Sequence, residues 1–220
     1  MLSAETEAIA RRLRAHQPVL DAQFDVVFPD DLRPWSRDHW TPVVVAQRAV
    51  AWLACGAKDV VLDVGAGAGK FCVIGALSCE ASFVGLERRP ALVRAAERAA
   101  RLLRVDRRIR FDHSSVLAID WTRFAGVYLY NPFGELLLSI DARHASEPDE
   151  PRSTQQRREA YDRAVAEVER RLAELSPGTR VVTFHGFGGQ MPPGFELMGR
   201  EIIARGPLEL WIKRGPGRAP

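Results

Sequence analysis

A short apolar segment that leads directly into three closely spaced glycines constrains this chain more than any other feature. Residues 60–64 read Val-Val-Leu-Asp-Val, and Gly65, Gly67 and Gly69 follow at alternate positions. An apolar run of this length that ends at glycine predicts a buried strand, and residues 70–77 predict a helix behind it. Because glycine carries no Cβ, a ligand can approach the backbone of such a turn closely. The segment therefore predicts a strand–loop–helix unit suited to binding a ligand.

Strand and helix signals alternate through the rest of the chain, and this alternation predicts the fold class. Thr41 is the expected N-cap of a helix, with Pro42 at the first helical position. The chain ends on two strands with no helix between them, which favours an antiparallel last strand. We therefore expect an α/β three-layer Rossmann-like sandwich with a seven-stranded, mostly parallel sheet and an antiparallel C-terminal strand. The predicted strands are 60–64, 81–86, 109–111, 126–130, 179–184, 195–204 and 208–213, and the predicted helices are 4–15, 41–53, 70–77, 91–103 and 155–175.

Size and composition predict one domain with a short extension. The chain has 220 residues, of which 46% are hydrophobic and 27% charged, as in ordinary globular proteins. We expect residues 1–40 to form a helical and irregular lead-in and residues 41–215 to form the sheet domain. No apolar run approaches the roughly 18 residues of a membrane span, and the N-terminus lacks the apolar core of a secretory signal. A cytoplasmic protein without a membrane partner is expected, and the three cysteines lack zinc-ligand spacing, so no bound metal is expected.

Three kinds of nucleotide site use glycine-rich turns, and the spacing here separates them. A phosphate-binding P-loop requires a glycine five positions before its Gly-Lys pair and a hydroxyl after the lysine, but this chain has Val64 and Phe71 there. The dinucleotide fingerprint requires a small residue where this chain has Lys70. The spacing argues against a P-loop, and it weakens but does not exclude a nicotinamide-dependent oxidoreductase.

The remaining pattern, Asp63 near the end of a strand followed by G-x-G-x-G, resembles the first motif of class I S-adenosylmethionine-dependent methyltransferases. The resemblance covers roughly residues 41–213 and implies that S-adenosyl-L-methionine is the cofactor. It implies that Asp63 supports the cationic groups of the cofactor and that Glu87 accepts the ribose hydroxyls. Ser115 stands where this class often has an acid that contacts adenine, so that contact is left open. The cofactor-binding residues implied are Asp63, Gly65, Ala66, Gly67, Gly69, Glu87, Arg88, Ser115, Val116 and Asn131.

Asn131-Pro132-Phe133 follows the fourth predicted strand and resembles the [Asp/Asn/Ser]-Pro-Pro-[Tyr/Phe] motif of nitrogen-directed methyltransferases, less the second proline. In that family the Asn side-chain oxygen and the next carbonyl accept hydrogen bonds from the target nitrogen. The aromatic ring stacks on a planar target or meets a developing cation. An Asn-Pro turn after a strand is also ordinary turn chemistry. The resemblance implies that Asn131, Pro132 and Phe133 are catalytic. Glu135, four residues after Asn131, is added to them as the first candidate to accept a proton from an amine. Tyr128 and Tyr130 are further candidates, with packing in the core as the alternative for both.

The sequence leaves the methyl acceptor open. Shortened motifs of this kind occur among protein-lysine methyltransferases, so a lysine-like protein nitrogen is favoured. An RNA or small-molecule acceptor is the alternative, and the arginines between Arg88 and Arg108 are the best support for RNA, although such a stripe is usually a solvated helix face. A protein that binds the cofactor without catalysis also remains open.

Three further segments are expected near the site. The aromatic-rich segment 35–42 either folds over the methionine end of the cofactor or closes the core, and residues 185–189 are expected at the same sheet edge as Asn131. Residues 141–156 are predicted to form a loop because they contain prolines and many charges. A monomer or a small homo-oligomer is expected.

Overall fold

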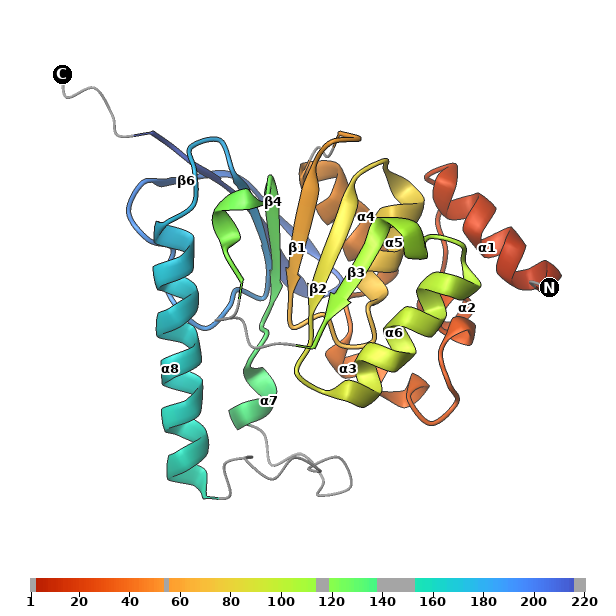
Figure 1. The fold of residues 1–220 in the computed structure, drawn as a ribbon, viewed down its shortest axis with the longest axis horizontal. Coiled ribbons are helices and arrows are strands. Elements are labelled where there is room, and N and C mark those ends of the chain that lie inside the picture. The colour runs from red at the N-terminus through yellow and green to blue at the C-terminus, as the bar shows by residue number, and fades with distance from the viewer. Residues whose placement is uncertain (1–2, 54–55, 114–118, 138–152, 216–220) are drawn as a thin grey trace.

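A single seven-stranded sheet organises the structure, with strand order β3-β2-β1-β4-β5-β7-β6 (Figure 1). The computed structural model describes residues 3–53, 56–113, 119–137 and 153–215. β1 to β5 are parallel, and β7 lies antiparallel between β5 and β6. This confirms the predicted sheet with its antiparallel C-terminal strand. The strands are β1 (Val60–Val64), β2 (Ser82–Leu86), β3 (Ile109–Asp112), β4 (Gly126–Tyr130), β5 (Arg180–Phe184), β6 (Phe195–Ile203) and β7 (Gly206–Lys213).

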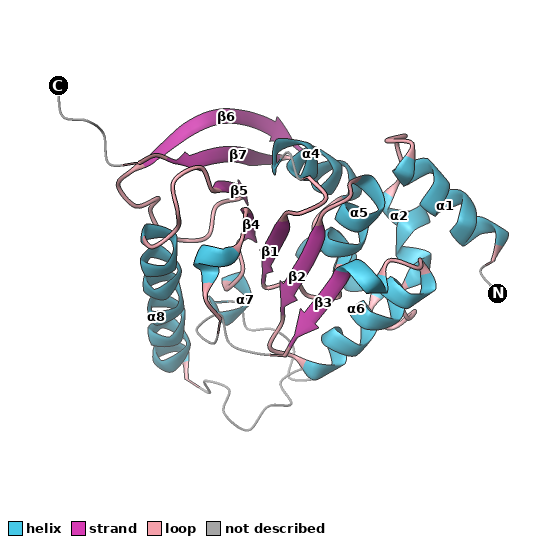
Figure 2. Ribbon diagram, turned by 45° about the horizontal axis from the view of Figure 1, so that its top comes forward, coloured by secondary structure: helices cyan, strands magenta, loops and turns pink. Residues whose placement is uncertain are grey.

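Helices cover both faces of the sheet (Figure 2). The predicted helices are all present, with ends shifted by at most a few residues. The α-helices are α1 (Ala4–Arg14), α2 (Asp21–Phe24), α3 (Ser36–His39), α4 (Val43–Leu53), α5 (Lys70–Ser78), α6 (Pro90–Leu102), α7 (Gly134–Leu137) and α8 (Thr154–Ala173). Short 3-10 helices are η1 (Asp25–Val27), η2 (Arg33–Trp35), η3 (Asp106–Arg108) and η4 (Trp121–Arg123). None of the helices in the described ranges combines the length and apolar character needed to cross a bilayer.

The hydrophobic core forms two clusters, one on each face of the sheet. One cluster joins residues of α1, α4, α5 and α6 to the β4 and β5 side chains that face them, including Tyr128 and Phe184. The other joins Val168 and Leu172 of α8 to the opposite side chains of the same strands, including Leu129. Adjacent residues of a strand point to opposite faces, so β4 contributes to both clusters in alternation. β1, β2, β4 and β5 are buried along almost their whole length because both of their faces are covered, whereas the edge strand β3 is only partly buried.

The lead-in is more ordered than the irregular stretch expected between α1 and α4. It contains α2, η1, η2 and α3, and a buried lysine of the sheet domain contacts three of these short elements, α2, η1 and α3. Lys70, only 2% exposed, donates to Asp21 Oδ1 at 2.6 Å and Ser36 Oγ at 2.9 Å, and its Nζ lies 2.7 Å from Asp25 Oδ1. A buried ammonium is stable only when it is paired and hydrogen-bonded. Lys70 thus binds the lead-in to the first turn of α5.

The start of α4 differs from the prediction. Thr41 was expected to cap this helix, but its hydroxyl lies 3.0 Å from the hydroxyl of Tyr128. The Val43 N–H instead donates to Asp21 Oδ1 at 2.9 Å. A residue distant in sequence therefore supplies the cap because Asp21 is already held in place by Lys70.

Replacing the buried ammonium tests this arrangement. Lys70→Met keeps the apolar stem but leaves the 7%-exposed Asp25 without its cation. We expect the free energy of unfolding to fall by about 3 kcal/mol, measured by urea denaturation. Lys58→Met, at an exposed lysine, should change it by less than about 0.5 kcal/mol. Equal stabilities for the two variants would contradict the role given to Lys70.

Candidate cofactor and acceptor site

The predicted site residues gather at the C-terminal edge of the parallel strands, where α/β sheets bind ligands. Figure 1 shows this edge at the bottom of the sheet, together with α3, α7 and the first turn of α6. The glycine loop follows β1, Glu87 follows β2, and Asn131 follows β4. Three motifs that are separate in the sequence therefore share one edge.

Main-chain hydrogen bonds anchor the glycine loop to the end of β2. The N–H groups of Gly65 and Ala66 both donate to the Leu86 carbonyl, at 3.0 and 2.8 Å. The Gly67 N–H donates to Glu87 Oε2 at 2.9 Å. The position of the loop is therefore set by the neighbouring strand as well as by its own sequence.

The three glycines are required for different reasons. All three have positive φ, at 77° for Gly65, 55° for Gly67 and 75° for Gly69. A Cβ on Gly65 would lie 3.0 Å from the Cβ of Pro132, and one on Gly67 would lie 3.6 Å from Cδ1 of Trp40. Gly69 instead faces side chains of β3 and α6, where a Cβ would overlap neighbouring atoms. The need for glycine at 69 is therefore explained by packing, whereas 65 and 67 adjoin the predicted site.

Glu87 is a buried carboxylate already engaged by its own chain. It is 5% exposed, and Oε1 accepts from the Arg89 N–H at 2.8 Å and Arg89 Nε at 3.1 Å. Each carboxylate oxygen has two acceptor positions, so Oε2, which accepts from Gly67, can accept another hydrogen bond. Arg88, which was predicted to contact the cofactor, is exposed beside this carboxylate.

Asp63 lies beneath the loop and is 3% exposed. Burial raises the pKa of its carboxyl to about 7, the Glu87 charge adds to this rise, and a hydrogen bond donated by Cys72 Sγ at 3.3 Å opposes it. Within the described ranges, no lysine or arginine forms an ion pair with Asp63. A buried carboxyl of this kind is stabilised in its charged form when a cation binds nearby.

Asn131 is held in an unusual backbone conformation at the end of β4. Its φ is +34°, its N–H donates to the Gly186 carbonyl at 2.9 Å, and its carbonyl accepts from the Gly134 N–H at 3.0 Å. A Cβ on Gly134 would overlap the Asn131 side chain. Asn131 is exposed, and Pro132 and Phe133 are half-buried. The turn therefore presents the Asn side chain at the edge of the sheet.

The end of β5 adjoins Asn131, as expected for residues 185–189. His185 also has a positive φ, at +56°, and its N–H donates to the Pro207 carbonyl at 3.0 Å. Its ring centroid lies 5.9 Å from that of Tyr130 and 4.4 Å from that of Phe184. Non-glycine residues in this region cost on the order of 1–3 kcal/mol each, and such strain concentrates at functional sites. The ends of β4 and β5 each carry such a residue.

Tyr128 does not fit the role of proton acceptor. It is 1% exposed and stacks on Phe71, with ring centroids 3.9 Å apart. Burial raises the pKa of its phenol well above 10. Tyr128 therefore belongs to the core. Tyr130 follows it on the same face of β4, two residues nearer the C-terminal end of the strand, and is only half-buried.

Some of the predicted residues cannot be placed. Ser115, Val116 and residues 141–152 of the predicted loop lie outside the described residues. Residues 154–156, the end of that predicted loop, instead form the first turn of α8, because the Ser153 side chain caps the helix by accepting from the Gln156 N–H. For Glu135 only the backbone, in α7, is described. Trp40 lies at the site but was not among the residues predicted from the sequence. It is 6% exposed, it faces Gly67, and its ring centroid is 4.8 Å from that of Phe28. The density of aromatic residues in 35–42 was the only sequence signal for it.

Comparison with known proteins shows the fold. No family model matches the chain, and no curated protein matches it by sequence. The structure resembles an RNA methyltransferase from Salinibacter ruber solved with S-adenosyl-L-homocysteine, with a TM-score of 0.56 and 20% identity over 80% of this chain and 94% of that one. It also resembles TrmN from Thermus thermophilus, with a TM-score of 0.58 and 18% identity over 79% of this chain and 49% of that one. The chain has the class I Rossmann-like methyltransferase fold.

The pKa of Asp63 predicts how stability depends on pH. Because the folded-state pKa, about 7, lies above the ordinary 3.8, the folded state holds this proton more tightly than the unfolded chain. Stability from this group is present in acid and is lost as pH rises toward and through 7. Between pH 5 and pH 8 we expect a loss of roughly 2–3 kcal/mol, measured by denaturant unfolding of the ligand-free protein.

Two variants separate Asp63 from other carboxylates. Asp63→Asn should remove this part of the pH dependence and make the ligand-free protein more stable than wild type at pH 8. Asp162→Asn, at an exposed acid of α8, should keep the wild-type pH dependence. An unchanged profile in Asp63→Asn would contradict the burial argument.

Proposed function

We propose that this protein is an S-adenosylmethionine-dependent methyltransferase that acts on a nitrogen atom. The observation that carries the proposal is the approach of Gly65 to Pro132, where a Cβ would lie only 3.0 Å from the proline Cβ. The glycine loop is the predicted cofactor site, and Asn131-Pro132-Phe133 is the predicted acceptor site. A group bound at one is therefore next to a group bound at the other, as transfer requires.

The residues at the loop fit this cofactor. Asp63 is a buried carboxyl with no cationic partner among the described residues, and the cofactor carries an ammonium and a sulfonium. Glu87 Oε2 retains acceptor capacity for ribose hydroxyls. When bound, S-adenosylmethionine supplies a methyl group activated by its sulfonium. Asp63, Gly65, Ala66, Gly67, Glu87, Arg88 and Asn131 are the described residues that would hold it.

Methyl transfer to nitrogen is an in-line displacement, so the protein contributes mainly by positioning the acceptor. The Asn131 side-chain oxygen and the Pro132 carbonyl can accept hydrogen bonds from an N–H or NH₂ group, and the Phe133 ring can stack on a planar acceptor. Contacts to Gly186 and Gly134 hold this turn in a single arrangement. The catalytic roles of Asn131, Pro132, Phe133 and Glu135 form part of this proposal.

Two acceptor classes compete. A lysine-like protein side chain is favoured by the shortened motif, whereas the arginines of α6 favour a nucleic acid and repel a cationic acceptor. Transfer from a methyl-labelled cofactor to separated protein, RNA and small-molecule fractions of a lysate distinguishes them. Calorimetry that detects NAD(P) binding but no binding of S-adenosylmethionine or S-adenosylhomocysteine would overturn the proposal.

Gly67→Val tests the cofactor loop. Valine strongly disfavours a φ of +55°, and its side chain would press on Trp40. We expect the affinity for S-adenosylmethionine, measured by calorimetry, to fall by at least about 100-fold, which corresponds to about 3 kcal/mol. Gly56→Ala is the control, because a Cβ there meets only ordinary van der Waals contact. Its affinity should equal that of wild type.

Asn131→Ala tests the acceptor motif. Loss of the side-chain oxygen should lower kcat by about 100-fold or more. The dissociation constant of the cofactor should rise much less, by about fivefold at most, because Asp63, the glycine loop and Glu87 still hold it. Asn131→Asp retains an acceptor oxygen and should recover part of the activity. Full activity in Asn131→Ala would show that the Asn side chain takes no part in transfer.

A further inference from the structure

The positive charge of this chain is concentrated in one short segment. Residues 88–110 contain nine arginines and two acidic residues, a net charge of +7, although the whole chain carries only +3. The other 197 residues therefore carry −4. An excess of arginine throughout the chain cannot explain this asymmetry, since the remaining arginines are more than balanced by acids.

Most of these arginines face solvent. Arg89 is bound to Glu87, and Arg108 donates to carbonyls at the end of α5. Seven others are exposed: Arg88, Arg94, Arg98, Arg101, Arg104, Arg107 and Arg110. Within the described part of the chain, Arg94, Arg98, Arg104 and Arg107 form no ion pair. We call Arg94, Arg98, Arg101, Arg104, Arg107 and Arg110 the α6 arginine face.

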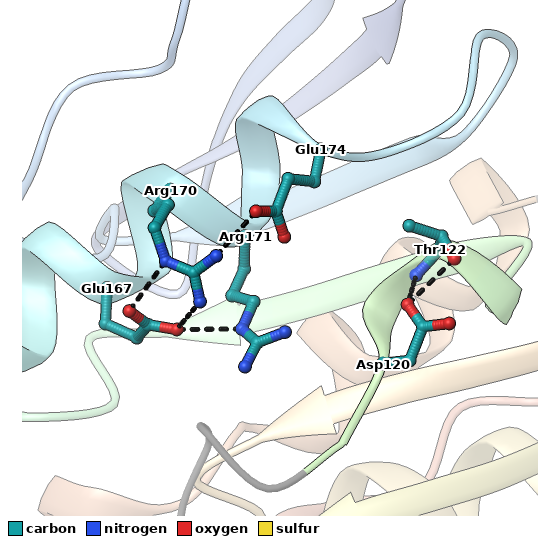
Figure 3. Close-up of polar contacts among 6 residues, drawn as sticks. All are labelled: Asp120, Thr122, Glu167, Arg170, Arg171 and Glu174. Atoms are coloured by element: carbon teal, nitrogen blue, oxygen red, sulfur yellow. Dashed lines mark hydrogen bonds and ion pairs between the residues drawn. The ribbon is translucent and has the colours of Figure 1, made fainter.

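The arginines of α8 provide a contrast within the same protein. Figure 3 shows Glu167 bound to Arg170 and Arg171, and Arg170 bound to Glu174. Arg158 pairs in the same way with Asp162 at 3.1 Å. Arginines balanced in this way present little net charge to a partner. The α6 arginine face has only Glu97 and Asp106 within its segment. Arg101 lies 3.5 Å from Glu97, and Arg110 pairs at 2.8 Å with Asp112, two residues beyond the segment, so four of the six arginines form no ion pair within the described residues.

The α6 arginine face begins beside the proposed site. α6 starts at Pro90, three residues after Glu87, at the sheet edge that carries the glycine loop (Figure 1). Arg94, Arg98 and Arg101 are spaced by four and three residues, so they share one side of the helix and span on the order of 10 Å. The opposite side of α6 is buried. A partner on this face would therefore extend from the site along the helix.

We propose that the α6 arginine face binds the phosphodiester backbone of an RNA whose unpaired base is the methyl acceptor. This rests on the proposed function and names its substrate class. Arginine clusters bind phosphates strongly and need no apolar centre. A protein partner normally requires apolar or aromatic residues at the centre of its interface. The large exposed apolar residues of the described chain are Leu20, Val44, Leu197, Met198 and Ile202, and none belongs to this face.

The acceptor turn favours RNA over duplex DNA. Asn131 and Phe133 lie at the sheet edge and can meet the edge and the face of a base only when that base is out of its stack. Extruding a base from a duplex costs a few kcal/mol, whereas RNA loops present unstacked bases without this cost. A structured RNA can thus place phosphates on α6 and a loop base at Asn131.

Charge-removing variants test the proposal. The triple variant Arg94→Gln, Arg98→Gln, Arg101→Gln is compared with a matched triple on α8, Arg158→Gln, Arg163→Gln, Arg170→Gln, which changes the total charge equally. The probe is a fluorescein-labelled RNA hairpin with a mixed-sequence loop, and anisotropy is measured at several salt concentrations. We expect the α6 triple variant to bind this RNA about 100-fold more weakly at 0.1 M salt than wild type does. The slope of the logarithm of the binding constant against the logarithm of the salt concentration should fall by about 2 in magnitude. The α8 triple variant should bind like wild type.

Two parallel measurements distinguish a loss of RNA binding from a loss of cofactor binding or of folding. Calorimetry should show that both triples bind S-adenosylmethionine like wild type, and thermal unfolding checks that both are folded. The RNA assignment would be overturned if all three proteins bound the RNA equally. It would also be overturned if wild type bound a duplex DNA of the same sequence equally well, or bound only phosphatidylserine vesicles or a polyglutamate peptide. Wild-type protein that binds S-adenosylmethionine but not RNA would overturn this inference alone. Failure to bind S-adenosylmethionine would overturn the proposed function.

Discussion

The attachment of the glycine loop to the end of β2 is the constraint on which the candidate site depends. Three consecutive N–H groups of the loop donate to the Leu86 carbonyl and to Glu87. These bonds fix the direction in which the chain leaves β1, and they place Gly65 against Pro132 and Gly67 against Trp40. Behind the loop, the buried Lys70 binds the lead-in to the first turn of α5. The loop is thus held from β2, from β4 and from the N-terminal segment.

Charge is distributed unevenly around this loop. Asp63 and Glu87 are buried beneath it, and burial raises the pKa of Asp63 to about 7. The neighbouring surface of α6 is strongly positive. A cationic cofactor would meet the buried acids, while a polyanionic acceptor would meet the arginines outside. The same sheet edge could therefore bind a cationic cofactor and a polyanionic acceptor at separate positions.

Much of the fold could be predicted from the sequence because its signals are local. The strands at 60–64 and 126–130 were predicted with their observed ends, and the terminal strand pair correctly indicated the antiparallel β7. The errors arose where a distant residue intervened. Thr41 bonds to Tyr128 and leaves Asp21 to cap α4. Tyr128, a candidate proton acceptor by strand position, is buried against Phe71.

The sequence by itself determined the strand–loop–helix unit, the acids at the strand ends and the Asn-Pro-Phe turn, because hydrophobic period and turn chemistry act over a few residues. Only the tertiary structure decided that Gly65 meets Pro132, that Lys70 is neutralised by Asp21 and Asp25, and that Asp63 has no cationic partner among the described residues. These are properties of proximity and burial. They arise when segments far apart in the chain pack together and exclude water, and no local pattern encodes them.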